Sequence, residues 1–380
     1  MDQITPATLA YDPVAAARQV ANTATGRACE QDRDEGFPVE DIADLARLGL
    51  LAAPIPSDDG GVGLGEEPGT CQLAAVLRLV GYGSLALGRL YEGHVNALQL
   101  VARYGDAGQR ARLFTDALDG HLFGVWNTDS PGDCLRLGED RRLRGVKTFA
   151  SGAGFVTRAL VTVKREPGAL PLMLVVPLEV GSRADLSGWH AHGMRASATG
   201  TVDFEDIAVS DDEILGGWDD YHRQPTFSGG AWRFAAVQLG GIEAVFDAWR
   251  GHLSATGRSG DPHQLARLGE GAIAVEGARH WVERAALIVA EDELAPERIV
   301  AFVNLARLAV EKAGLDVLQL AQRSVGLQGF LREHPLERLS RDLATYLRQP
   351  APDRALTTAA AEILTADGTA SDLFTPGGIL

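Results

Sequence analysis

The segment Gly193-Met-Arg-Ala-Ser-Ala-Thr-Gly-Thr-Val-Asp-Phe204 lies near the middle of the chain and ends in a strand-like pattern. Val202 and Phe204 are apolar and alternate with polar neighbours, which is typical of a β-strand because successive side chains point to opposite faces of a sheet. Residues 159–164 alternate in the same way, and residues 172–176 form an apolar run between two prolines. These segments predict a β region in the middle of the chain.

Helical patterns lie on both sides of this β region. Residues 41–49 have apolar side chains at a spacing of three, and Gly49 stands where a glycine commonly ends a helix. From about Gly229 onward helical spacing returns, and these helices are long enough for a bundle. The order predicts an α+β protein with a helical domain over 1–120, a β domain over 121–220 and a helical bundle over 221–380.

Composition excludes several classes of protein. The chain has 380 residues with ordinary hydrophobic and charged content, so it is globular and large enough to bury a cofactor. Its net charge of −16 repels phosphate backbones, which argues against a nucleic-acid partner. Three scattered cysteines and the lack of a long apolar run lead us to expect a soluble cytoplasmic protein without a membrane segment.

The common short motifs of enzymes are missing from the sequence. Gly61-Val-Gly-Leu-Gly65 is followed by Glu66 and lacks flanking strand and helix patterns, so it predicts a loop and not a dinucleotide site. No P-loop, nucleophile elbow or zinc-protease motif occurs. His190 and His192 have no Cys, Asp or Glu nearby at ligand spacing, and we assign no metal.

Several segments together, spread over nearly the whole chain, resemble the acyl-CoA dehydrogenase superfamily. They are Asp34-Glu-Gly-Phe-Pro38, Leu48-Gly-Leu50 with Gly60-Gly61, Leu143-Arg-Gly-Val-Lys-Thr-Phe-Ala-Ser151, Gly193 to Phe204, and Pro335-Leu-Glu-Arg-Leu-Ser-Arg-Asp342. The resemblance implies an N-terminal helical domain, a central β-barrel-like domain and a C-terminal four-helix bundle. It also implies an enzyme that holds FAD between the β domain and the bundle.

The resemblance assigns residues to the flavin ring. They are Trp126, Asn127 and Thr128 against the pyrimidine end, and Phe149, Ala150 and Ser151, with an aromatic beside the ring and a hydroxyl toward N5. A flavin needs such donors and an apolar wall, because its reduced ring carries charge that must be stabilised away from water. Alternatively, Trp126 and Phe149 are core residues and Ser151 caps a strand end.

The resemblance also assigns residues to the rest of FAD. Arg258 matches an arginine directed at the pyrophosphate, and Gly326 and Gly329 match glycines near the adenine half that a neighbouring subunit supplies. The local sequence departs from the family pattern, since Leu327 replaces a glycine and Arg323 a glutamine. A homodimer or homotetramer built through the bundle is therefore expected.

The catalytic base of the family is missing. The family places a glutamate at one of two positions, which here carry Pro350 and Trp232, and neither side chain accepts a proton. At one of these positions the family's glutamate lies in a Tyr-Glu-Gly motif. The same three residues occur here as Tyr91-Glu92-Gly93, but in the N-terminal helical region, and we interpret them as a chance match. The resemblance therefore predicts an FAD-dependent oxidoreductase that does not oxidise simple saturated acyl-CoAs.

Three interpretations stay open at this point. Relatives without the glutamate include monooxygenases that oxidise nitrogen, sulfur or carbon, and His94 stands near their flavin-facing histidine, so His94 and Ser151 are candidate catalytic residues. Alternatively, His94 is a core or interdomain histidine. Alternatively, a relocated base such as Glu243 or Asp353 acts on an acyl thioester or another small molecule. A flavoprotein-like scaffold without chemistry is the third.

Overall fold

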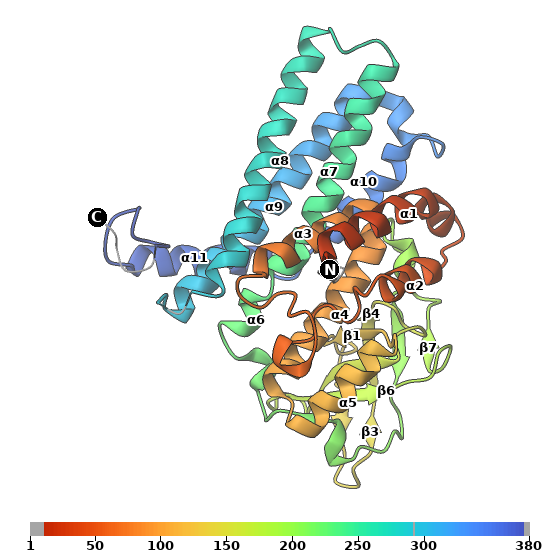
Figure 1. Cartoon of the computed structure of the whole chain (residues 1–380), viewed down its shortest axis with the longest axis vertical. Helices are drawn as coiled ribbons and strands as arrows, with labels where there is room; N and C mark the ends of the chain where they lie inside the picture. The colour runs from red at the N-terminus through yellow and green to blue at the C-terminus, as the bar shows by residue number, and fades with distance from the viewer. Residues whose placement is uncertain (1–10, 292, 376–380) are drawn as a thin grey trace, which may run out of the picture.

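The computed structural model describes residues 11–291 and 293–375 and shows helices, strands and helices in that order along the chain (Figure 1). The first helices are α1 (Pro13–Arg33), α2 (Val39–Arg47), α3 (Thr70–Gly83), α4 (Leu85–Tyr104) and α5 (Ala107–Leu118). Gly49 follows α2 with φ of +76°, a backbone conformation that favours glycine, as its position in the sequence predicts. Residues 60–65 lie in the predicted loop.

The middle of the chain forms three small sheets. Their strands are β1 (Phe123–Trp126), β2 (Arg136–Leu137), β3 (Leu143–Arg144), β4 (Val146–Ala150), β5 (Arg158–Val163), β6 (Leu172–Pro177), β7 (Ala184–Asp185), β8 (Gly200–Asp203) and β9 (Ile214–Leu215). The largest sheet has the order β1-β5-β6-β9, with β1 parallel to β5 and the other pairs antiparallel. A second sheet has the order β4-β8-β7, and β2 pairs with β3.

The largest sheet is covered on both faces. Alternation in β5 suggested one polar face, yet every residue from Ala159 to Val163 is buried. Leu160 packs in a cluster with helices α4 and α5, whereas its neighbours Ala159 and Val161 pack into the main core on the other side. The sheet is therefore a layer between two apolar clusters, and Thr162 is buried with a hydrogen bond to Asn127.

The C-terminal half is helical. It contains α6 (Thr226–Gly229), α7 (Trp232–Ala255), α8 (Pro262–Ile288), α9 (Pro296–Val325), α10 (Pro335–Tyr346) and α11 (Pro352–Thr365). In Figure 1, α7, α8 and α9 stand side by side above the sheets, with α10 beside α7, and α11 extends from the body as an arm. The predicted fold class is confirmed. Within the described ranges, no helix is long and apolar enough to span a membrane.

Two glycines bring α3 into backbone contact with α7. A Cβ at Gly240 would lie 2.0 Å from the carbonyl oxygen of Arg78, and one at Gly81 would lie 2.3 Å from that of Val237. Only glycine permits this approach, because a real Cβ cannot sit so close to a backbone atom. The contact ties the N-terminal helices to the bundle, and α4 then lies against the beginning of α7.

Candidate functional site

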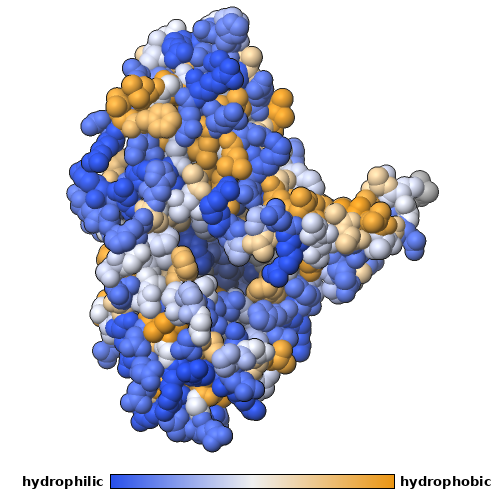
Figure 2. Space-filling view, turned by 180° about the vertical axis from the view of Figure 1, so that it is seen from behind, coloured by the Kyte–Doolittle hydropathy of each residue, from blue (hydrophilic) through white to orange (hydrophobic). Residues whose placement is uncertain are grey.

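A pocket of about 270 Å³ lies where α4, α6, α7 and α9 meet. It lies near the base of α11, since Gln349 and Pro350, which precede α11, form part of its wall. The face of the molecule in Figure 2 is hollowed beside the α11 arm, and the walls of this hollow are hydrophilic. The residues that line the pocket are Glu92, Asn96, Gln99, Leu100, Val125, Tyr221, Thr226, Phe227, Ser228, Gly230, Ala231, Arg233, Phe234, Asn304, Arg307, Gln349 and Pro350.

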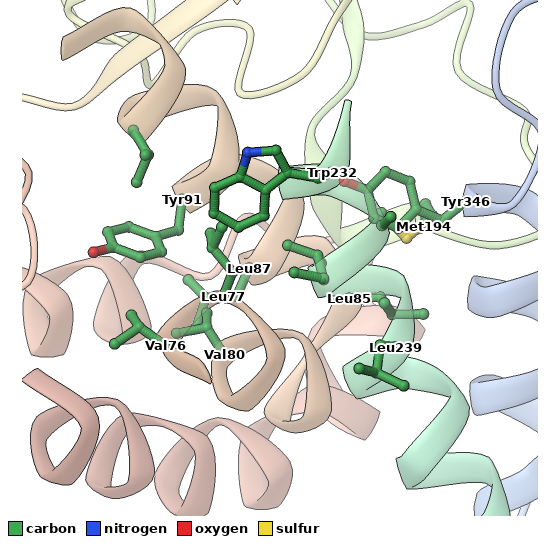
Figure 3. Packing of buried hydrophobic residues seen from close by; sticks show 14 of the residues in the cluster. Val76, Leu77, Val80, Leu85, Leu87, Tyr91, Met194, Trp232, Leu239 and Tyr346 are labelled. Carbon is green, nitrogen blue, oxygen red and sulfur yellow. The ribbon is translucent and has the colours of Figure 1, made fainter. Parts of the chain in front are cut away.

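Of the two positions that the resemblance gives for the catalytic base, one lines this pocket and the other lies between two of its lining residues in the sequence. Pro350 lines it, and Trp232 is flanked in sequence by the lining residues Ala231 and Arg233. The Trp232 side chain is buried at the beginning of α7, and the Tyr346 hydroxyl points toward it (Figure 3). Neither position supplies a carboxylate to the pocket.

Glu92 on α4 brings the one carboxylate that the described residues place in the pocket wall. One of its oxygens accepts from Arg89 Nη1 at 2.5 Å, and the other accepts from the amide nitrogen of Asn96. Burial acts to lower the pKa of Arg89, but the charge of Glu92 raises it above its usual value. Glu92 thus lies in the N-terminal helical region as expected, yet the turn of α4 directs its side chain into the pocket, which a chance match does not anticipate.

Three polar side chains of the bundle, those of Arg233, Arg307 and Asn304, line the same pocket as Glu92. The Arg233 Nε donates to the Asn96 side-chain oxygen, and Arg307 Nη2 donates to the Pro350 carbonyl at 2.8 Å. Among the described residues, no carboxylate lies within 4 Å of either guanidinium, and the Asn304 side chain has no hydrogen-bond partner. Burial lowers the pKa of Arg233 to about 10 and also lowers the pKa of Arg307.

His94 lies in the core and not in this pocket. Its side chain is fully buried, Nδ1 accepts from the backbone N–H of Phe123 at 3.1 Å, and Nε2 lies 2.7 Å from the carbonyl oxygen of Leu51. Because Nδ1 accepts, Nε2 carries the proton and the ring is neutral. Burial lowers the pKa of His94 to about 4. Neither ring nitrogen is free for a flavin or substrate, which removes the reason to treat His94 as catalytic.

The residues assigned to the flavin ring lie at the ends of two strands. Trp126 ends β1, and its indole nitrogen donates to the Ser151 carbonyl oxygen at 3.0 Å, just after β4. The Ser151 hydroxyl accepts from Thr199 at 3.3 Å. Phe149 has φ of +52° and is 67% exposed, with its ring edge-on to Trp189. Trp126 is thus buried, whereas Phe149 presents a free aromatic face.

Other parts of this group differ in exposure. Ala150 is buried, and Asn127 and Thr128 are exposed. The Asn127 side-chain oxygen accepts from the Thr162 hydroxyl at 2.6 Å, and the Asn127 backbone carbonyl oxygen accepts from the buried Lys147. The Thr128 carbonyl oxygen accepts from the backbone N–H of Thr148 at 3.0 Å, so the backbone carbonyls of both residues are held by bonds to β4. Their assignment to the flavin remains a prediction.

Arg258, Gly326 and Gly329 gather at the other end of the bundle. Arg258 Nη1 donates to the Ser324 carbonyl at 3.1 Å, close to Gly326 with φ of +73°. Helix α7 has 24 residues, and at 1.5 Å per residue it places Arg258 about 36 Å from the beginning of that helix. The two groups of predicted cofactor residues are therefore separate within one chain.

The two reserve bases lie outside the pocket. Glu243 is held by Arg78 at 2.8 Å and by Arg279 at 2.9 Å, beside a different surface groove. Asp353 is exposed near the beginning of α11. Among the described residues, no three His, Cys, Asp or Glu side chains are arranged to hold a metal ion. His190 and His192 lie in a loop, where neither is buried.

Comparisons with known proteins agree with this arrangement. Residues 14–121 match the family described as acyl-CoA dehydrogenase, N-terminal domain, and residues 216–347 match acyl-CoA dehydrogenase, C-terminal domain. A dibenzothiophene monooxygenase of Rhodococcus erythropolis is 25% identical over 376 residues, which cover 88% of this chain and 89% of that protein. The human mitochondrial short-chain specific acyl-CoA dehydrogenase is 24% identical, covering 83% and 80%.

Solved structures show the same fold. The FMN-bound TdsC of Paenibacillus sp. A11-2 matches with a TM-score of 0.82 at 19% identity, covering 96% of this chain and 100% of that one. Methanesulfinate monooxygenase of Pseudomonas fluorescens matches with a TM-score of 0.80 at 23% identity, covering 96% and 99%. With both family domains matched in order around the sheets, the chain belongs to the acyl-CoA dehydrogenase superfamily.

Proposed function

We propose that this protein is a flavin-dependent monooxygenase that oxidises a small molecule in the pocket between α4, α7 and α9. One observation carries the proposal: of the two base positions that the resemblance gives, Pro350 lines this pocket and Trp232 lies between two lining residues, neither holds a carboxylate, and Glu92 is already engaged by Arg89 and Asn96. The similarity to dibenzothiophene monooxygenases over most of the chain supports it.

The strand ends near the pocket fit a flavin ring. Phe149 offers an exposed aromatic face, and the Ser151 hydroxyl retains its proton for donation because it accepts from Thr199. The bond from Trp126 to the Ser151 carbonyl holds the two strand ends together. Val125 lines the pocket one residue before Trp126, so a ring held at these strand ends would lie next to the pocket.

A reduced flavin supplies two electrons to O₂, so that one oxygen atom enters the substrate and the other leaves as water. The chain contributes binding and the exclusion of water. Leu100, Val125 and Phe227 provide apolar wall. The Ser151 hydroxyl, which accepts from Thr199, would donate its proton in a hydrogen bond to a ring held at the strand ends. No group needs to remove an α-proton in this chemistry, which explains why the base positions tolerate Pro350 and Trp232.

We propose that the complete flavin site forms between subunits. Arg258 and Gly326 lie about 36 Å from the beginning of α7 in the same chain. A flavin held at the strand ends would therefore meet these residues only from another copy, in a homodimer or homotetramer. The resemblance favours FAD, and FMN-bound TdsC is a structural neighbour, so both flavins belong in the binding test.

Anaerobic mixing tests the reaction class. We expect that protein loaded with oxidised FAD or FMN keeps its visible absorbance when butyryl-CoA or octanoyl-CoA is added. We also expect that the reduced form gives a transient near-ultraviolet band when it meets O₂. Rapid bleaching by an acyl-CoA would overturn the proposal. Failure to bind either flavin at tens of micromolar would favour the scaffold interpretation.

A variant locates the base if bleaching does occur. Glu92 is the only carboxylate that lines the pocket within the described chain, so Glu92→Gln would stop an acyl-CoA reaction that depends on it. Glu243→Gln is the matched control, since Glu243 is held by two arginines in a separate groove. Bleaching that persists in Glu92→Gln and disappears in Glu243→Gln would assign a relocated base.

A further inference from the structure

We infer that the pocket binds a substrate carrying an oxyanion, of the carboxylate or sulfinate class, through Arg233, Arg307 and Asn304. The inference deepens the proposed function by naming a substrate class, and it rests on that function for the oxidation but not for the binding. The physical basis is the set of polar groups in the pocket wall that lack partners in the described part of the chain.

The first step is the charge balance of the pocket. Arg89, Arg233 and Arg307 bring three positive charges to the pocket and its edge, and Glu92 brings one negative charge. Glu92 is already bound to Arg89 at 2.5 Å. The two remaining guanidinium groups have no counter-ion within 4 Å among the described residues, in a protein whose net charge is −16. Both guanidinium groups belong to half-buried residues, and a partly desolvated cation without a close counter-ion favours an anionic ligand.

The second step is the supply of free donors. Within the described ranges only Nε of Arg233 is used, by Asn96, so both terminal nitrogens remain free to bind two oxygens as a fork. Arg307 uses Nη2 for the Pro350 carbonyl, and its Nε is buried without a partner. Both terminal nitrogens of Arg233 and Nη1 of Arg307 thus have no hydrogen-bond partner in the described part of the chain, and a carboxylate or sulfinate presents two acceptor oxygens for such donors.

The third step is Asn304. This side chain lines the pocket, is only 8% exposed, and makes no hydrogen bond with any described residue. Its amide atoms are not among the buried atoms that lack a partner, so they keep contact with the pocket space, where a ligand group can bond to them. Asn304 lies three residues before Arg307 on α9, and side chains at this spacing share a helix face. The two donors therefore approach the same part of the pocket.

The size of the pocket limits the ligand. A volume of about 270 Å³ accommodates a single ring or a short chain with its oxyanion. The apolar residues Leu100, Val125, Phe227 and Phe234 are available for the body of such a molecule. An oxyanion could also belong to a flavin phosphate, and the two sources are separated by the experiment below.

Titration calorimetry on the full-length protein, with and without saturating FMN, tests the inference. Benzoate and benzenesulfinate serve as anionic probes, and benzamide serves as the neutral probe of the same shape. We expect the wild type to bind benzoate at least about 10-fold more tightly than benzamide, because charge-assisted hydrogen bonds are the stronger ones. Arg233→Gln should weaken benzoate binding by about 10- to 100-fold and change benzamide binding little.

Control variants separate a specific loss of anion binding from a general change of charge or a failure to fold. Arg332→Gln removes one positive charge from an exposed loop and should leave benzoate binding unchanged. Asn304→Leu removes the amide donors without a change of charge and should weaken benzoate binding about 5- to 10-fold. Circular dichroism and melting curves confirm that each variant is folded. If Arg233→Gln does not fold, Arg307→Gln and Asn304→Leu carry the test.

Each outcome has one meaning. Equal binding of benzoate and benzamide by the wild type, or an equal loss in Arg332→Gln and Arg233→Gln, would overturn the inference. A loss of FMN affinity in Arg233→Gln with unchanged benzoate binding would assign the arginines to a flavin phosphate and also overturn it. Because the titration needs no turnover, acyl-CoA bleaching would overturn the monooxygenase proposal while leaving anion binding intact.

Discussion

Polar side chains on one face of α4 line the pocket, whereas those on the opposite face pack into the core. Glu92 and Asn96 lie on the face that lines the pocket, whereas Tyr91 and His94 lie on the face that packs into the core. Glu92 and His94 are two residues apart, which is about 200° of rotation in a helix of 3.6 residues per turn. Rotation about the helix axis, and not nearness in sequence, therefore separates a pocket residue from a core residue.

The two faces of α4 also differ in whether the polar side chains there have hydrogen-bond partners. On the core side, both His94 nitrogens are engaged by backbone groups of Leu51 and Phe123. On the pocket side, the chain of bonds that begins at Glu92 and Asn96 ends at Arg233, whose terminal nitrogens have no partner among the described residues. A buried polar group that is satisfied supports the fold, and one that is left unsatisfied marks a place for a ligand.

The largest expected effect is on the core face. His94→Ala removes both bonds and leaves the Phe123 N–H and the Leu51 carbonyl buried without partners. We expect the free energy of unfolding to fall by about 3–5 kcal/mol, measured by urea denaturation. Benzoate affinity of the folded fraction should not change. Unchanged stability together with loss of flavin binding would restore His94 as a site residue.

The second expected effect is a loss of free energy of unfolding at acid pH, caused by His94 on the core face. The pKa of His94 is about 4 in the folded chain, whereas an exposed histidine of the unfolded chain has a pKa of about 6.5, so the unfolded state takes up the proton first as pH falls. The contribution of neutral His94 to the free energy of unfolding should be complete above pH 6.5, and it should decline by up to about 3 kcal/mol as the pH falls toward 4.

His94→Gln serves as the control for this acid response. Urea midpoints for the wild type and His94→Gln should differ most near neutral pH and converge as the pH approaches the folded-state pKa of about 4, because glutamine does not titrate. Two curves that stay parallel over this range would show that the His94 proton is not coupled to unfolding.

On the pocket face, Glu92→Gln should cost about 2 kcal/mol of stability, because Arg89 is left without its counter-ion while keeping 27% of its side chain exposed. The same change should tighten benzoate binding a few-fold, since the pocket becomes more positive. Thermal melts and calorimetry measure the two effects. The double variant Arg89→Met with Glu92→Gln should regain part of the stability; a further loss would contradict the pairing.

The smallest effect should come from a carboxylate remote from both faces. Glu243→Gln weakens bonds to Arg78 and Arg279, which are 28% and 34% exposed, so we expect a loss of about 1 kcal/mol or less by urea denaturation. Benzoate affinity and the visible spectrum of bound flavin should stay the same. A change in either would place Glu243 in communication with the pocket.

Much of the fold could be predicted from local pattern. Spacing of apolar residues over 41–49 indicated a helix that the structure has at Val39–Arg47, and the apolar run at 172–176 indicated β6. Burial of both faces of β5 could not be predicted from its alternation, because the second apolar layer comes from α4 and α5. Long-range packing, and not local propensity, decided that point.

The pocket was harder to predict than the fold. Pro350 and Trp232 could be identified by resemblance as positions without a base. The place of Glu92 in the pocket wall could not be predicted, because it depends on which face of α4 meets α7, and no spacing in the sequence records that contact. Arg307 comes from another helix, so its nearness to Glu92 depends on how the bundle packs.

The backbone contact at Gly81 and Gly240 also determines which parts of the pocket can change. Helices held at this distance cannot slide past each other or accept larger side chains there, because any Cβ would collide with a carbonyl. We expect divergence in substrate size to come from the lining segments outside the long helices α4, α7 and α9, residues 221–230 and 349–350. The glycines thereby divide the site into a rigid frame and an adaptable rim, and engineering of new specificity should begin at the rim.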